Sequence, residues 1–447
     1  QMSPRMAASL TEVDETTTSW PQLASDVALG GALVCHAARK IVLGQALSSG
    51  RYYIDLNEQL RQPHPVHVPV PYKPHPDAME PRALPELTVG PQRTLTRELL
   101  ETWMAWGTSA PSPHNHQGWA FCFESGELHC AIDESRVYTG LDTEATASIL
   151  AVGCAVENIV LAAQATGFST AVRETGTTPR VATLTFTPSS PQREYIEEMR
   201  TRITNRRTTA PAPISADAAT ALQHVAITGQ CELHLLTDQN KLKVLAELAR
   251  QAGRLMFLQP QAYSEIVDGI RIGAKEVALG DGIDVETMDS TAKDIAALSL
   301  IRHAPVGAAL REIGLGSALG NAERDAFLTA SAAGLLILPG DDTPNAFFRG
   351  GRVFQRVWLE ATRLGLAIHP VSNLPWMFRR VDRMQGRGFS PEAREFLRTV
   401  RPTFDSLFPA SKGARLGLLR ISSASRPAAR TLRRPLSDVF VWSGDDG

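Results

Sequence analysis

The sequence predicts an α+β protein made of two related units in tandem, and two observations lead to this prediction. First, residues 144–167 form a helical run that is apolar on nearly every side, and two strand-like runs, 169–172 and 181–186, follow it. A helix without a polar face is buried, so we expect it to form the core of a unit that also contains a sheet. Second, the run 153–167 matches the run 351–365 at both terminal glycines and at several apolar positions. Either one unit has been duplicated, or two buried helices that end in glycine are alike by chance.

The N-terminal part of the chain is expected to lie outside these two units. Residues 1–25 are rich in serine, threonine and acidic side chains, which is typical of a flexible or poorly packed segment. Residues 26–45 have helical periodicity, and residues 51–56 have the composition of a short strand. The many prolines of residues 61–90 predict a stiff, extended linker or a strap over the surface. The globular body then begins near Thr94.

A polar loop separates a helix from a hairpin at the start of the body. Residues 94–106 have one apolar side, as a helix has, while residues 119–123 and 127–132 alternate like the two strands of a hairpin. The intervening prolines and glycine of residues 109–119 rule out regular structure, and most of the other side chains there carry hydrogen-bonding groups. A loop fixed between two packed elements suits the binding of a polar, planar ligand, although an ordinary polar connector has the same composition.

Composition and cysteine content argue against several classes of function. The net charge is −2 and no long run of like charges is present, which argues against nucleic-acid binding. The apolar runs 149–165 and 332–338 contain polar residues or are short, so no membrane span is expected, and the start of the chain has no visible signal peptide. The five cysteines are scattered without a Cys-x-x-Cys pair, which argues against disulfides or zinc and fits a reducing cytoplasm. His114 and His116 have no cysteine or carboxylate partner in the loop, so no metal site is expected.

The loop resembles the flavin-binding loop of the nitroreductase family, in which a Ser-Ala-Pro-Ser-x-x-Asn-x-Gln-Pro-Trp pattern contacts FMN. The matching residues are Ser109, Ala110, Pro111, Ser112, Asn115, Gln117 and Trp119. Gly118 replaces the family's proline, which loosens the exit from the loop. The resemblance implies that the cofactor is FMN and that the loop residues in contact with it are Pro111, Ser112, His114, Asn115 and Gln117.

A second match lies at the start of the second half. Residues 203–209 resemble the family's Arg-Arg-Ser/Thr opening, in which a basic side chain and a hydroxyl hold the flavin phosphate. Arginine binds phosphate through paired hydrogen bonds, which makes this role chemically reasonable, and solvated surface charge is the alternative. The family's next basic residue is missing, because Ala210 and Pro211 follow. The resemblance also places the backbone after the second core helix at the reactive edge of the flavin, and a basic C-terminal segment at the phosphate. The cofactor-binding residues implied in the second half are Arg206, Arg207, Thr208, His369, Pro370, Val371, Arg430 and Arg434.

The two halves therefore carry complementary parts of one site. In the family, the polar loop and the arginine opening at one flavin come from opposite subunits of a dimer. A duplicated chain that keeps one of each would form an intramolecular pseudo-dimer with a single flavin site, as in the mycobacterial dormancy-associated (Acg-like) nitroreductase homologues. The expected organisation is a segment resembling the end of a ThiF-like adenylating domain in residues 1–60, a linker in 61–92, a first half in 93–200 and a second half in 201–447, with a lid-like insertion at about 259–326. No adenylation is expected, because the nucleotide-binding Gly-x-Gly-x-x-Gly turn is missing.

The function implied by the resemblance is that of an FMN-dependent oxidoreductase, which passes hydride from NAD(P)H through flavin N5 to a nitroaromatic, a quinone or a similar acceptor. No catalytic side chain is expected, because the flavin carries the chemistry. The alternatives are a flavin-binding or storage protein, and a non-catalytic partner module of a ThiF-like adenylating enzyme. The expected partners are a small-molecule substrate and a second copy of the chain, with neither nucleic acid nor membrane, in the cytoplasm.

Overall fold

The computed structural model describes residues 4–13, 24–52, 54, 83–89, 94–312, 314, 316–409, 411–423, 425 and 429–443. The contacts divide the chain into two compact units. The first contains residues 1–72 and 292–318, and the second contains residues 73–291 and 319–447. Every residue of the candidate site belongs to the second unit.

The first unit is helical in its described parts. Its helices are α1 (Pro4–Leu10), α2 (Ala24–Val42), α10 (Ala292–Ile301) and α11 (Ala304–Glu312). α1 packs against α10 and α11, where the side chains of Ala7 and Ala8 are fully buried. The carboxylate of Glu12 accepts a hydrogen bond of 2.8 Å from the backbone N–H of Gly316. The prediction of a poorly packed segment is therefore wrong for residues 4–13, because small apolar side chains let this short helix pack closely.

The predicted helix of residues 26–45 is confirmed as α2, but the strand predicted at 51–56 is not found in its described part. Arg51, Tyr52 and Ile54 have no regular structure, and Tyr53, Asp55 and Leu56 lie outside the described residues. These aromatic and branched side chains have strand propensity, but propensity yields no strand where no neighbouring strand pairs with them.

Part of the proline-rich segment runs along the second unit as a strap. Residues 83–89 have no regular structure, and the side chain of Leu87 is buried in the core. The indole N–H of Trp106 donates to the carbonyl of Pro85 over 3.0 Å, which fixes the strap on α3 (Arg97–Thr108). The remaining residues of the predicted linker, 61–82 and 90–92, lie outside the described residues.

The first half of the second unit forms a five-stranded sheet of order β11-β1-β2-β4-β3. Its strands are β1 (Trp119–Glu124), β2 (Glu127–Ile132), β3 (Phe168–Glu174), β4 (Arg180–Pro188) and β11 (Phe440–Trp442). The hairpin prediction is confirmed, because β1 and β2 pair antiparallel with Trp119 opposite Ile132. β11 comes from the C-terminus and adds to β1 in parallel, so the end of the chain completes the sheet of the first half.

The second half forms a four-stranded antiparallel sheet of order β5-β8-β10-β9. Its strands are β5 (Glu232–Leu236), β8 (Ala332–Pro339), β9 (Ala367–Pro370) and β10 (Gly413–Ser422). Along the chain, the first half runs helix, strand, strand, helix, strand, strand from α3 onward, and the second half has the same order from α6 (Ala216–Thr228) once the elements inserted between β5 and β8 and between β9 and β10 are left aside. The strand order in the two sheets also corresponds, because β1-β2-β4-β3 maps onto β5-β8-β10-β9.

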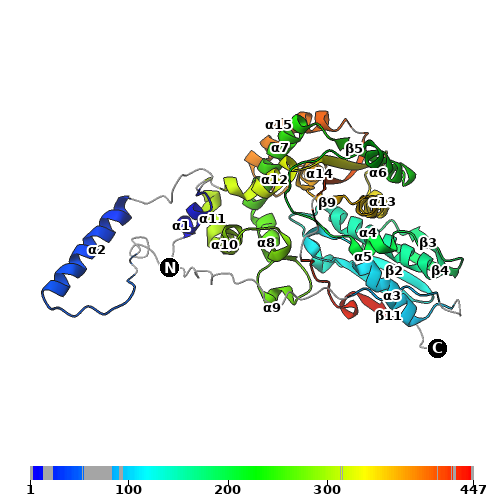
Figure 1. The fold of residues 1–447 in the computed structure, drawn as a ribbon, viewed down its shortest axis with the longest axis horizontal. Helices are drawn as coiled ribbons and strands as arrows, with labels where there is room; N and C mark the ends of the chain where they lie inside the picture. The colour runs from blue at the N-terminus through cyan, green and yellow to red at the C-terminus, as the bar shows by residue number, and fades with distance from the viewer. Residues whose placement is uncertain are drawn as a thin grey trace. The chain divides into compact units, whose positions relative to one another are not determined.

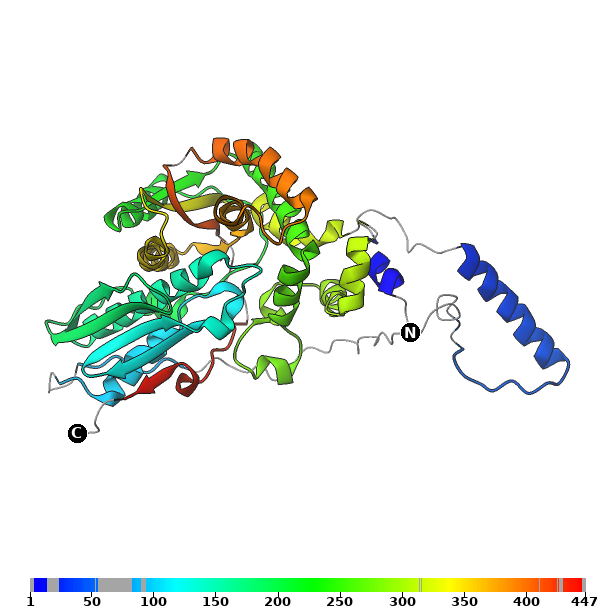
Figure 2. The same ribbon diagram turned by 180° about the vertical axis from the view of Figure 1, so that it is seen from behind.

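The two predicted core helices are confirmed as α4 (Thr146–Ala165) and α13 (Pro344–Arg363), and they pack against each other between the two sheets (Figures 1 and 2). α4 is long and apolar enough to cross a membrane, with a mean hydropathy of 1.8, but its residues are buried in the core. Gly153 of α4 and Gly351 of α13 meet where the helices cross. A Cβ on Gly153 would lie 2.2 Å from the carbonyl oxygen of Phe348, and one on Gly351 would lie 2.1 Å from that of Leu150. The two glycines therefore allow the helix backbones to touch.

The remaining elements connect these halves or lie in insertions. α5 (Ile196–Thr201) joins the halves, and α14 (Asn373–Met384) and α15 (Pro391–Leu407) lie between β9 and β10. The residues between β5 and β8 form a long insertion that includes the predicted lid. Its elements in the second unit are α7 (Gln239–Leu258), α8 (Pro260–Asp268), β6 (Ile270–Arg271), α9 (Ala274–Val277), β7 (Ile283–Asp284) and α12 (Asn321–Leu328).

Candidate functional site

A cavity of about 1720 Å³ lies beside the polar loop of residues 109–119. Six parts of the second unit line it: residues 83–85 of the strap, residues 97–108 of α3, the loop, residues 200–206 at the end of α5 and beyond, residues 274–287 of the insertion, and the C-terminal residues 429–442. α3 and the loop belong to the first half, and the last three parts follow from α5 onward. The volume exceeds the roughly 300–1,000 Å³ of a common small-molecule pocket, so the cavity has room for a nucleotide-sized ligand.

The loop has an unusual backbone that its own contacts maintain. His114, Asn115 and Gln117 have φ values of 48°, 54° and 52°, in the left-handed region that few residues other than glycine adopt. The hydroxyl of Ser112 accepts a hydrogen bond of 3.1 Å from the N–H of Gln117, which closes the loop on itself. Residues held in such conformations often lie at ligand sites, where the surrounding structure offsets their conformational cost.

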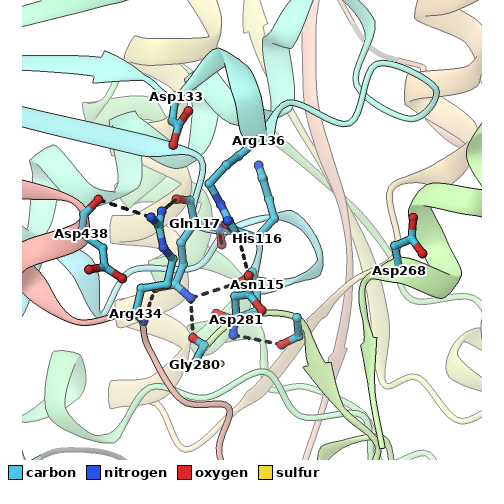
Figure 3. A network of polar contacts seen from close by, with 12 residues as sticks. Asn115, His116, Gln117, Asp133, Arg136, Asp268, Gly280, Asp281, Arg434 and Asp438 are labelled. Atoms are coloured by element: carbon cyan, nitrogen blue, oxygen red, sulfur yellow. Dashed lines mark hydrogen bonds and ion pairs between the residues drawn. The ribbon is translucent and has the colours of Figure 1, made fainter. Parts of the chain in front are cut away.

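Two amide side chains of the loop bind backbone from distant segments (Figure 3). The amide nitrogen of Asn115 donates to the carbonyls of Gly282 and Leu432, over 3.0 and 3.1 Å. That of Gln117 donates to the carbonyl of Gly280 over 2.8 Å, and its carbonyl oxygen accepts from the N–H of Arg434 over 3.0 Å. Asn115 still lines the cavity, whereas Gln117 is fully buried beside it. Both side chains therefore join the loop to the insertion and the C-terminal segment.

Two arginines bind the carbonyl end of α3, just before the loop. Arg202 donates to the carbonyl of Ser109 over 2.8 Å, and Arg433 donates to the carbonyls of Thr108, Ser109 and Ala110 over 3.1–3.3 Å. These carbonyls lack helical partners and lie at the negative end of the helix dipole, so cations are stabilising there. Burial, followed by the charges of Arg433 and Arg430, lowers the pKa of Arg202 to about 9. Both guanidinium groups therefore fix the loop in place.

Arg206 differs from these arginines because little in the protein satisfies it. Its hydrogen bond is a long one of 3.4 Å to the carbonyl of Thr287. Burial lowers its pKa to about 10, and no carboxylate among the described residues offsets this shift. A withdrawn cation without a paired carboxylate is costly, so the wall around Arg206 favours an anionic ligand.

His114 lines the cavity, and it is close enough to Arg206 for the guanidinium charge to affect the pKa of the imidazole. Burial is the main cause that lowers the pKa of His114 to about 4, and the charges of His116 and Arg206 add to the effect. The imidazole is therefore neutral at neutral pH and offers one N–H donor and one acceptor to a ligand. The imidazole of His114 and the hydroxyl of Ser112 are thus polar groups that line the same cavity as Arg206.

The structure brings together some predicted site residues and separates others from the cavity. Pro111, Ser112, His114, Asn115, Arg206, Arg430 and Arg434 line it, whereas Gln117, Arg207, Thr208, His369, Pro370 and Val371 are not among its lining residues. Arg430 donates to the backbone carbonyls of Arg200 and Arg202, over 2.9 and 2.6 Å.

The predicted residues away from the cavity have other surroundings. The guanidinium of Arg207 lies 3.8 Å from the Asp289 carboxylate, and Thr208 is exposed. His369 lies on β9, and its Nδ1 is buried without a hydrogen-bond partner among the described residues. Burial, followed by the charges of Arg206 and Arg420, lowers the pKa of His369 well below its usual value.

Sequence reasoning assigned no role to Arg202, and it placed the Gly280-Asp281-Gly282 turn in the lid-like insertion without a specific contact. The isolated arginine carries no motif, and its contact with α3 depends on the packing of the two halves. The turn had a local signal, because two glycines flank a single acidic residue, but its partners in the polar loop, Asn115 and Gln117, lie 167 and 163 residues away in sequence. Among the described residues, no cluster of three or more histidine, cysteine, aspartate or glutamate side chains could hold a metal ion.

Comparisons with known proteins give an uncharacterized relative and a weak match to a solved structure. No family model matches the sequence. The chain is 29% identical over 444 residues to the uncharacterized protein MT1398 of Mycobacterium tuberculosis (strain CDC 1551 / Oshkosh), and the match covers 97% of this chain and 60% of that protein. This chain therefore spans about three fifths of the length of that relative. Among solved structures, a nitroreductase with bound FMN from Bacteroides fragilis NCTC 9343 matches 55% of this chain and 95% of its own, with 13% identity and a TM-score of 0.29. A likeness at this level carries no argument about activity.

Proposed function

We propose that this chain binds one FMN in the cavity beside residues 109–119 and acts as a flavin-dependent oxidoreductase of the nitroreductase type. One observation carries the proposal. The loop that resembles a flavin-binding motif and the arginine of the second-half opening, 91 residues apart in sequence at Asn115 and Arg206, line the same cavity. A duplicated chain with one mixed site predicts that these two segments meet. An ordinary polar connector and a solvated surface arginine would not be expected to line one cavity.

The residues present fit FMN in charge and in size. The phosphate requires a cation, and Arg206 offers guanidinium donors that the protein leaves largely unused. Ser112 and His114 would add a hydroxyl and an imidazole. Asn115 would add the side-chain hydrogen-bonding groups that its contacts with Gly282 and Leu432 do not use. The ring and its ribityl chain require a large volume, which the cavity supplies. When bound, FMN would supply the redox chemistry, since its N5 takes hydride from NAD(P)H and the reduced flavin passes electrons to an acceptor.

The side chains of this site would bind, orient and shield rather than react. Arg433 and Arg202 fix the end of α3, so the loop holds one conformation before a ligand arrives. Asn115 and Gln117 tie that loop to two other segments, which keeps its polar groups turned to the cavity. Such preorganised donors stabilise an anion without reorganisation during binding.

An internal duplication accounts for the single site. The corresponding strand orders of the two halves, and the reciprocal contact of Gly153 and Gly351, support a pseudo-twofold relation between them. Under this relation two sites would be equivalent, but the polar loop occurs in the first half and the arginine opening in the second. The proposal therefore gives one FMN per chain.

Anaerobic titration tests the proposed activity. The purified protein is loaded with FMN, and its flavin absorbance is followed on addition of NADH or NADPH and then of a nitroaromatic or a quinone. We expect bleaching by one reductant and recovery of the absorbance by the acceptor. Stable FMN binding without bleaching would favour the alternative of a flavin-storage protein. A protein that takes up no FMN would favour the alternative of a partner module for an adenylating enzyme.

A further inference from the structure

The Gly280-Asp281-Gly282 turn of the insertion packs closely against the backbone of Arg433 and of Gly269, and it forms hydrogen bonds with the polar loop. Gly280 and Gly282 have φ values of 73° and 72°, which favour glycine at both positions. A Cβ on Gly280 would lie 2.6 Å from the carbonyl oxygen of Arg433, and one on Gly282 would lie 2.7 Å from that of Gly269. Backbone atoms do not yield as side chains do, so the turn requires both glycines to reach its place.

Asp281 connects this turn to two arginines on different segments, and Figure 3 labels one of them, Arg136. One carboxylate oxygen accepts from Arg136 over 2.5 Å, and the other accepts from Arg271 over 2.6 and 3.1 Å. Arg136 follows the hairpin of the first half, and Arg271 lies on β6 of the insertion. The Asp281 side chain is 13% exposed, so solvent weakens these ion pairs less than it weakens surface pairs.

The same arginine reaches the loop directly. Arg136 donates through Nε to the carbonyl of His116 over 2.8 Å. On the other side of the ion pair, the N–H of Gly282 donates to the carbonyl of Asn115 over 3.2 Å, in addition to the contact from the Asn115 side chain. Arg136 thus contacts both the loop and Asp281, and the turn that carries Asp281 contacts the loop again.

Both ion pairs of Asp281 depend on the ionisation of its carboxyl group at neutral pH. Burial alone would raise the pKa of Asp281, but the hydrogen bonds from Arg271 and Arg136 outweigh burial and lower the pKa. The carboxylate is therefore ionised, as both ion pairs require.

We propose that Asp281 is a positioning residue that latches the insertion onto the loop of residues 112–117 and thereby slows ligand exchange from the cavity. The latch acts through the loop, because Asp281 does not line the cavity, whereas Gly280 and Asp284 on either side of it do. The ligand part of this inference rests on the proposed function, but the latch itself concerns contacts of the chain alone. Opening of the insertion would therefore require the loss of the Arg136–Asp281 ion pair, while the Arg271–Asp281 pair holds the turn within the insertion.

The test compares Asp281→Asn with Asp268→Asn in the full chain. Asp281→Asn keeps the size of the side chain and removes its charge. Asp268 is a matched control in the same insertion, since its carboxylate takes a single 3.3 Å hydrogen bond, from Ser264. Hydrogen exchange of the amides in residues 112–117 and 274–287 is measured first, without ligand. We expect Asp281→Asn to speed this exchange about tenfold to a hundredfold, as the loss of a charged hydrogen bond implies, and Asp268→Asn to leave it unchanged.

The second measurement is the dissociation rate of FMN from the loaded protein. We expect this rate to rise by a similar factor in Asp281→Asn and to stay at the wild-type value in Asp268→Asn. Wild-type exchange in Asp281→Asn would overturn the latch. Faster exchange with an unchanged FMN dissociation rate would overturn its role in ligand retention.

Failure of the proposed function gives a different result. A wild-type chain that does not bind FMN, together with faster exchange in Asp281→Asn, refutes the flavin proposal and supports the latch. If Asp281→Asn does not fold, Arg136→Gln removes the ion pair that joins the insertion to the first half and leaves the carboxylate on Arg271. The same exchange measurement then applies, with a similar increase expected and with wild-type exchange again overturning the latch.

Discussion

Replacing Arg206 with glutamine separates binding of an anion from stability of the fold. In the structure, Arg206 makes one long hydrogen bond to Thr287 and has no carboxylate partner among the described residues. Its removal therefore takes away a partly desolvated charge and little else. We expect the free energy of unfolding of Arg206→Gln to equal or exceed that of the wild type, because an unpaired cation in a withdrawn position is costly.

The same substitution is expected to weaken FMN binding strongly. A hydrogen bond to a charged group contributes about 1.5–3 kcal/mol, which corresponds to a dissociation constant raised roughly 10- to 150-fold. Titration of the protein with FMN, followed by flavin fluorescence or by calorimetry, measures this change. Riboflavin, which lacks the phosphate, should bind Arg206→Gln and wild type with similar affinity, so the difference between the two ligands isolates the phosphate contact.

Arg207→Gln is the matched control, because its guanidinium faces Asp289 and does not line the cavity. We expect this variant to bind FMN as the wild type does. Equal FMN affinity in Arg206→Gln and wild type would refute the reasoning, as would an equal loss of FMN and riboflavin. A lowered melting temperature in Arg206→Gln would show that the arginine serves the fold.

Three further predictions concern the framework of the site. Gly153→Ala should lower the free energy of unfolding by about 1–3 kcal/mol, because the added Cβ meets the Phe348 carbonyl at 2.2 Å, while Gly30→Ala, with nothing within 4 Å, should not destabilise its helix; thermal melting compares them. Burial raises the pKa of Asp142 to about 6, so the folded state binds this proton more tightly than the unfolded state, and ionisation removes stability as the pH rises. The free energy of unfolding of the wild type should therefore fall by up to roughly 3 kcal/mol relative to that of Asp142→Asn as the pH rises from 4 to 7. The melting temperatures of both proteins against pH measure this change. Arg433→Gln should weaken FMN and riboflavin binding alike, because the Arg433 guanidinium lines the cavity but donates to the carbonyls at the end of α3, so its loss loosens the loop; selective loss of FMN would instead assign Arg433 to the phosphate.

Local patterns were sufficient to predict the central elements of the second unit. The apolar face of residues 94–106 and the all-round apolar run of residues 144–167 correspond to α3 and α4, within three residues at each end. The alternation around Ser125-Gly126 corresponds to the hairpin of β1 and β2. These signals are periodic and lie within one segment, so they do not depend on the rest of the chain.

The partners of the site residues were beyond such patterns. Gln117 and Gly280 are 163 positions apart, and nothing in either neighbourhood encodes their hydrogen bond. The terminal arginines show the same difficulty, because a guanidinium binds a phosphate or a row of carbonyls with the same donors. Arg433 meets the carbonyls at the end of α3, and its sequence neighbours carry no trace of that helix. The cavity itself arises from packing between the halves.

The number of FMN molecules bound per chain at saturation tests the central claim most directly. Equilibrium dialysis of the full chain against FMN, with protein and flavin quantified separately, gives this number. A cavity that takes its loop from the first half and Arg206 from the second predicts a value of one. A value of zero would contradict flavin binding, and a value of two would contradict the single mixed site.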